Sequence, residues 1–255
     1  MNRRVLSLVA PAIATLAGVV ILIGLGDWQL HRLAWKEGLI AEVTTRVHAA
    51  PVEPPAEADW PSLKPSDYEY RHVRIAGVYD GAHQALVYRA LENPHGPYAG
   101  PGYLVITPLR RADGSVILVN RGFVPEDQKD KAALAANQGQ TIVTGLMRSS
   151  EERNFFTPAD DPAKGRWYTR DVAAIAHATE LQRHAPFSID ADAGADRNAL
   201  PEGGETIIDF PNNHFSYAMT WFGMALALIG VFVAFAMSQL RGPDEPDGGA
   251  GEKSA

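Results

Sequence analysis

One of the eight histidines in this chain of 255 residues stands apart by its position. His214 follows Asn212-Asn213, a natural helix N-cap pair, and opens a long apolar run. At helical spacing Trp221 shares its face, and Tyr217 is adjacent. An imidazole beside aromatic rings at a membrane boundary could ligate haem iron. It could equally hydrogen-bond to lipid headgroups or to the rest of the protein, and spacing alone favours this second interpretation.

The rest of the sequence contains none of the common catalytic patterns. There is no G-x-S-x-G elbow, H-E-x-x-H pair, phosphate-binding glycine loop or dinucleotide fingerprint. His72 and His83 lie in or beside predicted strands, and we interpret them as partly exposed sheet residues. The chain has no cysteine, which excludes disulfides and thiol chemistry. These observations predict a protein that is not an enzyme.

Two uncharged apolar runs lie near the two ends of the chain. Residues 5–26 and about 214–237 contain no Asp, Glu, Lys or Arg. A transmembrane helix needs roughly 20 apolar residues, so both runs are long enough to span a bilayer. A secretory signal is an alternative for the first run, but the run exceeds the usual apolar core of a signal and no small-x-small cleavage site follows it. We therefore expect a hairpin of two transmembrane helices.

Basic residues next to the two runs predict the orientation. Arg3 and Arg4 precede the first run and Arg241 follows the second, and such residues favour the cytoplasmic side. No Arg- and Ser-rich transit region precedes the first run, which favours a bacterial inner membrane over an imported organellar protein. The predicted order is a cytoplasmic N-terminus (residues 1–4), a first span (5–26), a periplasmic domain (27–213), a second span (214–237) and a disordered cytoplasmic tail (238–255).

The predicted periplasmic domain begins with a helix and continues as strands. Trp28, Arg32, Trp35 and Leu39 share a helical face, so the first helix should extend beyond the membrane. Five prolines in residues 49–65 predict a linker. Runs rich in Val, Ile and Tyr, separated by Gly, Pro, Asp and Asn, predict strands at residues 70–79, 85–89, 103–108, 116–120, 141–147, 186–190 and 206–209.

Turn and cap residues complete this prediction. Residues 110–114 end in Asp-Gly and predict a hairpin turn, and Asp171 should cap a short helix over residues 171–179. Residues 126–136 are read as a helix or a loop. Strands do not alternate with helices, so the fold class is α+β: two transmembrane helices flanking a mainly antiparallel, barrel- or sandwich-like β domain.

The charge balance restricts the partners. Residues 27–213 carry 19 basic and 26 acidic side chains. An acidic domain is a poor binder of nucleic acid, since phosphate contacts need clustered Lys and Arg. Membrane lipid is the expected environment of the two apolar runs.

Five sequence blocks, in order along the chain, resemble the surfeit locus protein 1 family, the assembly factors of cytochrome c oxidase. They are GDWQLHRLAWK (26–36), YRHV with GVY (70–79), GPGYLVITPL (100–109), ILVNRGFVP (117–125) and NNHFSYAMTWF (212–222). The resemblance covers nearly the whole chain, including its two apolar runs, and is less clear over residues 126–206. Any one block alone would be weak, but five in the family's order and spacing are specific.

The resemblance implies a role in building the haem a-containing catalytic subunit of a haem-copper oxidase, with that subunit and the haem a synthesis machinery as partners. It implies that His214 matches the histidine proposed to contact haem a, and Tyr217 and Trp221 would then shield the macrocycle. Scaffolding of oxidase subunits without haem contact is an alternative. Copper delivery is disfavoured because Cu(I) prefers sulfur ligands, and the chain has no Cys and five Met. A membrane-anchored enzyme is disfavoured by the lack of a catalytic motif.

Three glycines in these blocks are predicted to be structurally required. Gly100, Gly102 and Gly122 lie beside predicted strands. We expect backbone conformations there that are costly for other residues.

Overall fold

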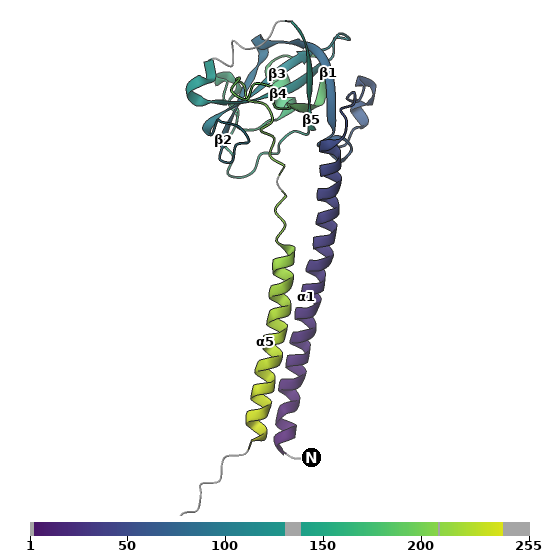
Figure 1. Cartoon of the computed structure of the whole chain (residues 1–255), viewed down its shortest axis with the longest axis vertical. Helices are drawn as coiled ribbons and strands as arrows, with labels where there is room; N and C mark the ends of the chain where they lie inside the picture. The colour runs from purple at the N-terminus through teal and green to yellow at the C-terminus, as the bar shows by residue number, and fades with distance from the viewer. Residues whose placement is uncertain (1–2, 131–138, 209, 242–255) are drawn as a thin grey trace, which may run out of the picture. The chain divides into compact units, whose positions relative to one another are not determined.

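A computed structural model describes residues 3–130, 139–208 and 210–241 of the chain (Figure 1). It contains two compact units. One comprises residues 1–41 with 210–255, and the other is residues 42–209. The disorder expected from residue 238 is wrong for residues 238–240, because the second long helix continues to Leu240. Residues 242–255 of that tail, the first two residues and residues 131–138 lie outside the described residues.

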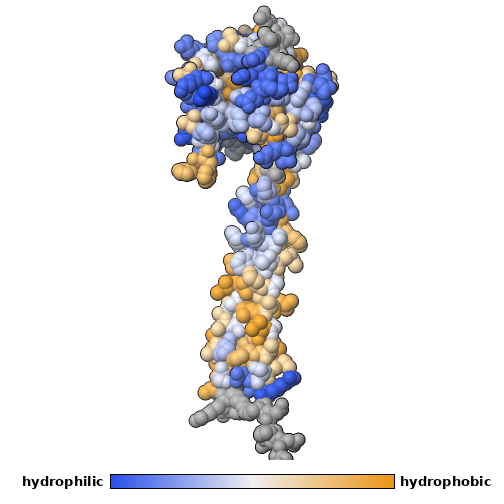
Figure 2. All heavy atoms as spheres, turned by 90° about the vertical axis from the view of Figure 1, so that its left-hand side faces the viewer, coloured by the Kyte–Doolittle hydropathy of each residue, from blue (hydrophilic) through white to orange (hydrophobic). Residues whose placement is uncertain are grey.

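The first unit is built from two long helices, α1 (Arg3–His48) and α5 (His214–Leu240). Both are long and apolar enough to cross a membrane, with mean hydropathies of 2.5 and 2.1 over their most apolar stretches. Hydrophobic residues dominate the outer surface of this unit over much of its length (Figure 2). The structure therefore supports membrane association through two helices.

Small residues let α1 and α5 approach closely. A Cβ atom added to Gly26 would lie 2.5 Å from the ring of Phe222, and one added to Gly18 would lie 2.8 Å from Leu228. Ala218 is fully buried. Close backbone approach at small residues is the usual way in which membrane helices associate.

The helix α1 continues well past residue 26, as the face of Trp28, Trp35 and Leu39 predicts. The unit boundary, however, differs from the predicted one. Residues 27–41 group with the helices and not with the β domain. A continuous α-helix carries its own backbone hydrogen bonds and needs no sheet to stabilise it.

The second unit contains six strands and short helices, and the six main strand predictions are confirmed. The strands are β1 (His72–Tyr79), β2 (Ala85–Leu91), β3 (Gly100–Arg110), β4 (Val116–Pro125), β5 (Gln140–Arg148) and β6 (His184–Ala191). The short helices are η1 (Glu57–Ser62), α2 (Pro65–Tyr68), η2 (Gly81–His83), η3 (Glu126–Gln128), η4 (Pro162–Lys164) and α4 (Val172–Ala178). The strand predicted at residues 206–209 is wrong where it is described, because residues 206–208 pair with no strand.

The strand order is β1-β5-β6-β4-β3-β2, and β1 also pairs with β3. That extra pairing, Val78 with Arg110 and Tyr79 with Leu109, closes five strands into a small barrel while β2 extends the other part of β3. All pairs are antiparallel as predicted except β4 with β6, which is parallel. The chain between them passes through β5 and α4, and this long crossover makes a parallel pairing possible.

The strand β4 is buried on both faces and connects two hydrophobic clusters. Val116 and Leu118 belong to a cluster with β2 and α4, whereas Ile117 and Val119 pack among β1, β5 and β6. Such two-sided burial explains why the β4 sequence is almost continuously apolar instead of alternating.

The proline-rich segment is not an open linker, which corrects the prediction for residues 49–65. Val52 pairs with β1 through Val52 N to His72 O (3.1 Å) and Arg74 N to Val52 O (2.9 Å). Trp60 in η1 is buried and packs edge-on against Phe187, with 6.2 Å between ring centroids. Prolines reduce the backbone entropy lost on ordering, and the buried tryptophan adds hydrophobic stabilisation.

The predicted backbone conformations are confirmed at Gly100, Gly122 and the β3–β4 turn but not at Gly102, whose φ is not positive. Gly100 and Gly122 have φ of +88° and +129°, and Gly114 in the predicted β3–β4 turn has φ of +82°. Gly102 is required by crowding, because a Cβ there would lie 2.3 Å from the carbonyl oxygen of Val124.

Candidate functional site

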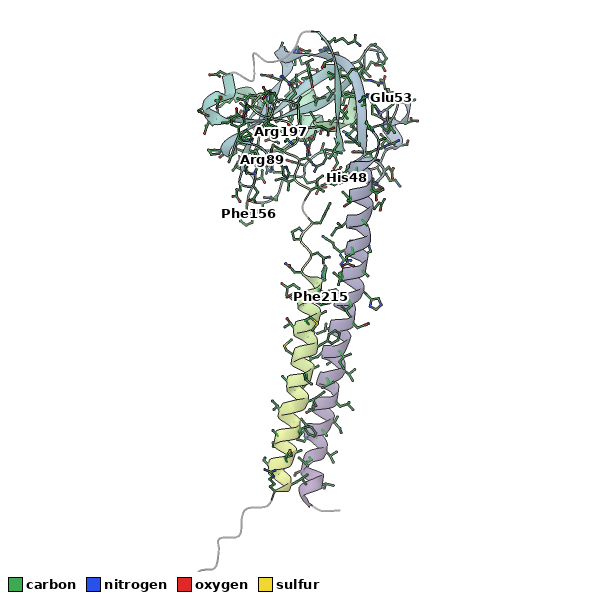
Figure 3. All side chains as sticks on the ribbon, viewed as in Figure 1. His48, Glu53, Arg89, Phe156, Arg197 and Phe215 are labelled. Atoms are coloured by element: carbon green, nitrogen blue, oxygen red, sulfur yellow. The ribbon has the colours of Figure 1, made fainter. Side chains whose placement is uncertain are left out.

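The histidine singled out by the sequence opens α5, next to Phe215 (Figure 3). Asn213 occupies the N-cap position as predicted, but its side chain makes no capping hydrogen bond. His214 instead contacts α1, with 2.8 Å between its Nδ1 and Oε1 of Gln29. An amide oxygen only accepts, so Nδ1–H is the donor. A neutral imidazole in this tautomer keeps the lone pair of Nε2 available for a metal.

The aromatic residues predicted beside His214 differ in exposure. Tyr217 is 56% exposed, whereas His214 and Trp221 are half-buried. Ala218, one turn after His214, is fully buried. The helix therefore carries the imidazole about one turn before an exposed phenol ring and two turns before a half-buried indole.

This donor set suits one kind of metal partner. No group of three or more His, Asp or Glu side chains that could hold a free metal ion occurs among the residues that the structure describes. Iron in a porphyrin already has four ring ligands and needs only an axial one from the protein. The single imidazole at the start of α5 is thus better suited to be an axial ligand of haem iron than to hold a free metal ion.

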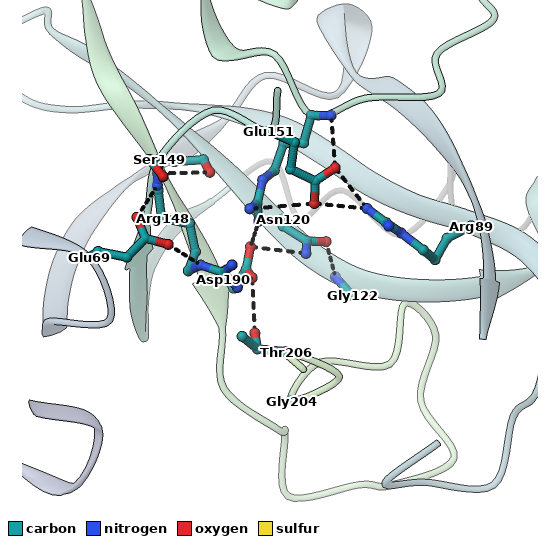
Figure 4. A network of polar contacts seen from close by, with 12 residues as sticks. Glu69, Arg89, Asn120, Gly122, Arg148, Ser149, Glu151, Asp190, Gly204 and Thr206 are labelled. Atoms are coloured by element: carbon teal, nitrogen blue, oxygen red, sulfur yellow. Dashed lines mark hydrogen bonds and ion pairs between the residues drawn. The ribbon is translucent and has the colours of Figure 1, made fainter. Parts of the chain in front are cut away.

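A second cluster of chemically capable residues lies inside the β domain, and the sequence did not predict it (Figure 4). Asp190 on β6 is buried and accepts hydrogen bonds from Arg170, Asn120 (3.1 Å) and Thr206 (3.0 Å). Arg148 on β5 also pairs with it, at 3.3 Å.

Two further carboxylates extend this buried network. Glu69 accepts from Arg148 Nε at 2.9 Å and from the backbone N–H of Ser149 at 2.7 Å. Glu151 accepts two hydrogen bonds from Arg89, at 2.8 and 2.9 Å, and one from the backbone N–H of Arg170, at 3.4 Å. The guanidinium of Arg170 lies 3.7 Å from it.

Electrostatics keep Asp190 and Glu151 ionised. Burial by itself raises the pKa of Asp190, but Arg170 and Arg148 outweigh it, so the pKa lies below its usual value. Burial also raises the pKa of Glu151, but the charges of Arg170 and Arg89 outweigh burial, so this pKa too lies below its usual value. A general acid needs the opposite shift, so these two carboxylates are suited to structure and not to proton transfer.

A cavity of about 120 Å³ adjoins the network and is lined in part by Arg89, Glu151, Arg170 and Asp190. Three arginines face three acids here, which leaves no surplus charge for an anionic ligand. The main effect of the buried network is to join the strands to the segment that contains Thr206, whose hydroxyl donates to Asp190. The only sequence signals were Asn120 and Asp190, polar residues within apolar strand runs.

The structure gives His72 a more definite role than a partly exposed sheet residue. Its side chain is 18% exposed, and both ring nitrogens face oxygen acceptors: Nδ1 at 2.9 Å from Ala49 O and Nε2 at 2.8 Å from Asp192. Both nitrogens must carry protons to donate, so the protonated ring suits this site. His83 fits the earlier interpretation, being exposed and paired with Asp80.

His72 should make stability depend on pH. Burial lowers its pKa, but the hydrogen bonds to Asp192 and Ala49 outweigh burial and raise it above the usual 6.5. The stabilisation is then complete below pH 6.5 and is lost as pH rises through the higher folded-state pKa. We expect His72→Ala to lower stability by about 1–2 kcal/mol at pH 6 and clearly less at pH 9. Thermal unfolding of the purified chain measures this, with His83→Ala as the exposed control, and equal losses at both pH values would contradict it.

The fold and the histidine site define a class: a small β-barrel domain in a chain with two candidate membrane-spanning helices. Comparison with known proteins narrows this class, because a match to the SURF1 family spans residues 16–226. Surfeit locus protein 1 of Mus musculus is 36% identical over 216 residues, covering 80% of this chain and 68% of the mouse protein. The human protein is 35% identical over 217 residues (80% and 70%), and that of Takifugu rubripes is 33% identical over 233 residues (86% and 93%). The chain belongs to the SURF1 family.

Proposed function

We propose that this protein is an assembly factor for haem-copper cytochrome c oxidase, and that it assists haem a insertion into, or stabilisation of, the catalytic subunit. The observation that carries this proposal is membership of the SURF1 family, with a match that runs from α1 through the β domain into α5. The catalytic subunit is the proposed partner, together with the machinery of haem a synthesis. The proposed role is non-catalytic: the protein holds and releases cargo or subunits.

The proposed location is a bacterial inner membrane, with the β domain in the periplasm. The two apolar helices support a membrane location. Arg3, Arg4 and Arg241 support the orientation, because basic residues near a span favour the cytoplasmic side. The relatives named above come from vertebrates, so the bacterial setting is part of the proposal.

Haem a is the proposed transient cargo, and His214 is its proposed axial ligand. Bound iron would take the lone pair of Nε2, which is free when Nδ1–H donates to Gln29. Tyr217 and Trp221 would contact the apolar macrocycle, since both lie within two turns of His214. A single half-buried ligand allows release, which a carrier needs.

Deletion of the gene tests the assembly role. We expect a strong loss of active haem-copper oxidase and of its high-spin haem signal, because haem a would reach the catalytic subunit inefficiently. Quinol oxidases that contain only haem b serve as the control and should be little affected. Normal haem and copper content in the oxidase of the deletion strain would overturn the proposal.

Variants of His214 test the haem role separately. His214→Ala should reduce haem a retained on the purified, co-expressed protein by roughly tenfold or more and shift its optical spectrum, since no Cys is present to replace the ligand. Gln29→Ala should cause a smaller loss of haem, because it removes the hydrogen bond that fixes the His214 tautomer but leaves the imidazole ligand in place. His31→Ala is the matched exposed control and His72→Ala the control in the β domain. Unchanged haem content in His214→Ala would leave only a scaffold role, and an equal loss in either control would move the site.

A further inference from the structure

The β domain exposes two adjacent phenylalanines that no other part of the described chain covers. Phe155 and Phe156 are 95% and 89% exposed, and their rings pack edge to face with 5.5 Å between centroids. Exposed single apolar residues are common, but paired aromatic rings at a loop tip are a typical mark of an interaction site. We propose that residues 154–157, the aromatic finger, insert into an apolar pocket with a basic rim on the extramembrane surface of an integral membrane protein. The identity of this partner as the oxidase catalytic subunit rests on the function proposed above.

The finger is held in a defined turn. Asn154 Oδ1 accepts hydrogen bonds from the backbone N–H of Phe156 (2.9 Å), from that of Thr157 (3.0 Å) and from the Thr157 hydroxyl (3.0 Å). The backbone of Thr157 also donates to Asn154 O at 3.2 Å. Local turns of this kind are made by Asn because its short side chain replaces a backbone acceptor.

The base of the finger is fixed to the domain. Glu151 accepts both of its short bonds from Arg89, and its backbone N–H donates to Arg170 O at 3.1 Å. Ser150 accepts from the backbone N–H of Val172, the first residue of α4, at 3.0 Å. A turn fixed before binding loses less entropy on association, so exposed rings displayed in this way are prepared to bind.

The finger lies at one particular end of the domain. Phe156 is found at the same end as His48, the last residue of α1 (Figure 3). A hydrophobic projection stands out at this end of the domain in Figure 2. The same chain contains two candidate membrane-spanning helices, so a partner embedded in a membrane is the natural candidate.

Charge decides between a protein and a lipid surface. Peripheral insertion into anionic lipid is strengthened by Lys and Arg, at about 1 kcal/mol each. Glu151 is paired with Arg89, and Glu152 and Arg153 next to the finger balance each other, but residues 27–213 as a whole carry 26 acidic against 19 basic side chains. An anionic bilayer would repel such a domain, whereas a protein pocket with basic residues around it would attract it.

Photo-crosslinking in the full chain tests the occupant directly. A benzophenone amino acid replaces Phe155 or Phe156 in membranes that express the oxidase, and the products are identified by mass spectrometry. Ile142 on β5, an exposed apolar residue elsewhere on the domain, is the control position. We expect the catalytic subunit to be crosslinked from the finger and not from position 142.

Other products separate the two proposals. A different integral membrane protein would support the finger as a docking site and overturn the oxidase subunit as its partner. Crosslinks to lipid or to a second copy of this chain, or no specific product, would overturn the finger as a protein-docking site. The assembly role would then still be judged by the deletion experiment.

Substitutions test whether the finger contributes to binding. Phe155→Ser with Phe156→Ser should reduce co-purification of the catalytic subunit by roughly tenfold or more, since central aromatic residues dominate interfaces. The melting temperature of this double variant should equal that of the wild type, because both rings are exposed. Glu152→Lys should also weaken capture, most strongly at low salt, and Ile142→Ser should not. Wild-type capture by the double variant would overturn the proposal, and wild-type capture by Glu152→Lys would overturn the basic rim.

Discussion

Replacement of Gly122 by valine should unfold the β domain or leave it marginally stable. The φ of +129° at Gly122 is a conformation that β-branched residues avoid. A Cβ there would also lie 2.0 Å from the carbonyl oxygen of Glu202. Phe123 and Glu202 exchange two backbone hydrogen bonds, of 2.9 and 2.8 Å, so this segment cannot move away without breaking them. Strain and overpacking together should cost about 3–5 kcal/mol, a large part of the total stability of a domain.

Thermal unfolding and limited proteolysis of the full chain in detergent measure this effect. Gly139→Val is the matched control, because a Cβ at Gly139 meets nothing within 4 Å. Cellular abundance should fall for Gly122→Val and not for the control. If both variants melted at the wild-type temperature, the account of the segment around Glu202 would be wrong.

Asp190→Ala should be nearly as damaging, for an electrostatic reason. Arg170 is 2% exposed, and Asp190 is its closest ion-pair partner. Arg148 and Asn120 contact the same carboxylate. Removing Asp190 leaves the buried Arg170 facing the more distant Glu151, at 3.7 Å, and breaking a buried ion pair in this way costs about 3–5 kcal/mol. Asp161→Ala is the control, because Asp161 pairs with exposed Lys164 and such surface pairs contribute about 1 kcal/mol or less.

The same network predicts how stability changes in acid. The pKa values of Asp190 and Glu151 are lowered in the folded state, below the usual 3.8 and 4.5. Their stabilisation is complete above those unfolded-state values and is lost as pH falls through the lower folded-state values. The wild-type melting temperature should therefore drop steeply below about pH 4, and less steeply in Asp190→Asn. Parallel curves for the two proteins would contradict this role of Asp190.

The sequence alone determined the features that depend on local pattern. Two uncharged runs specified the apolar helices, because length and lack of charge are properties of a continuous segment. Six strands and the helix capped by Asp171 followed from side-chain type and turn residues, and the Asp171 side chain does accept from the N–H groups of Ala173 and Ala174. Gly100 and Gly122 could be predicted because glycine beside a strand often signals an unusual backbone conformation. His214 was identified by its position at the start of an apolar run.

Tertiary structure decided the contacts between distant residues. The partners of Asp190 lie 16, 20, 42 and 70 positions away in sequence, so no local pattern could join them. The parallel pairing of β4 with β6, the packing of the proline-rich segment and the hydrogen bond from His214 to Gln29 have the same origin. Each depends on which surfaces meet when the chain closes on itself. Burial then determines whether a charge or an imidazole finds a partner, and a one-dimensional pattern does not contain that information.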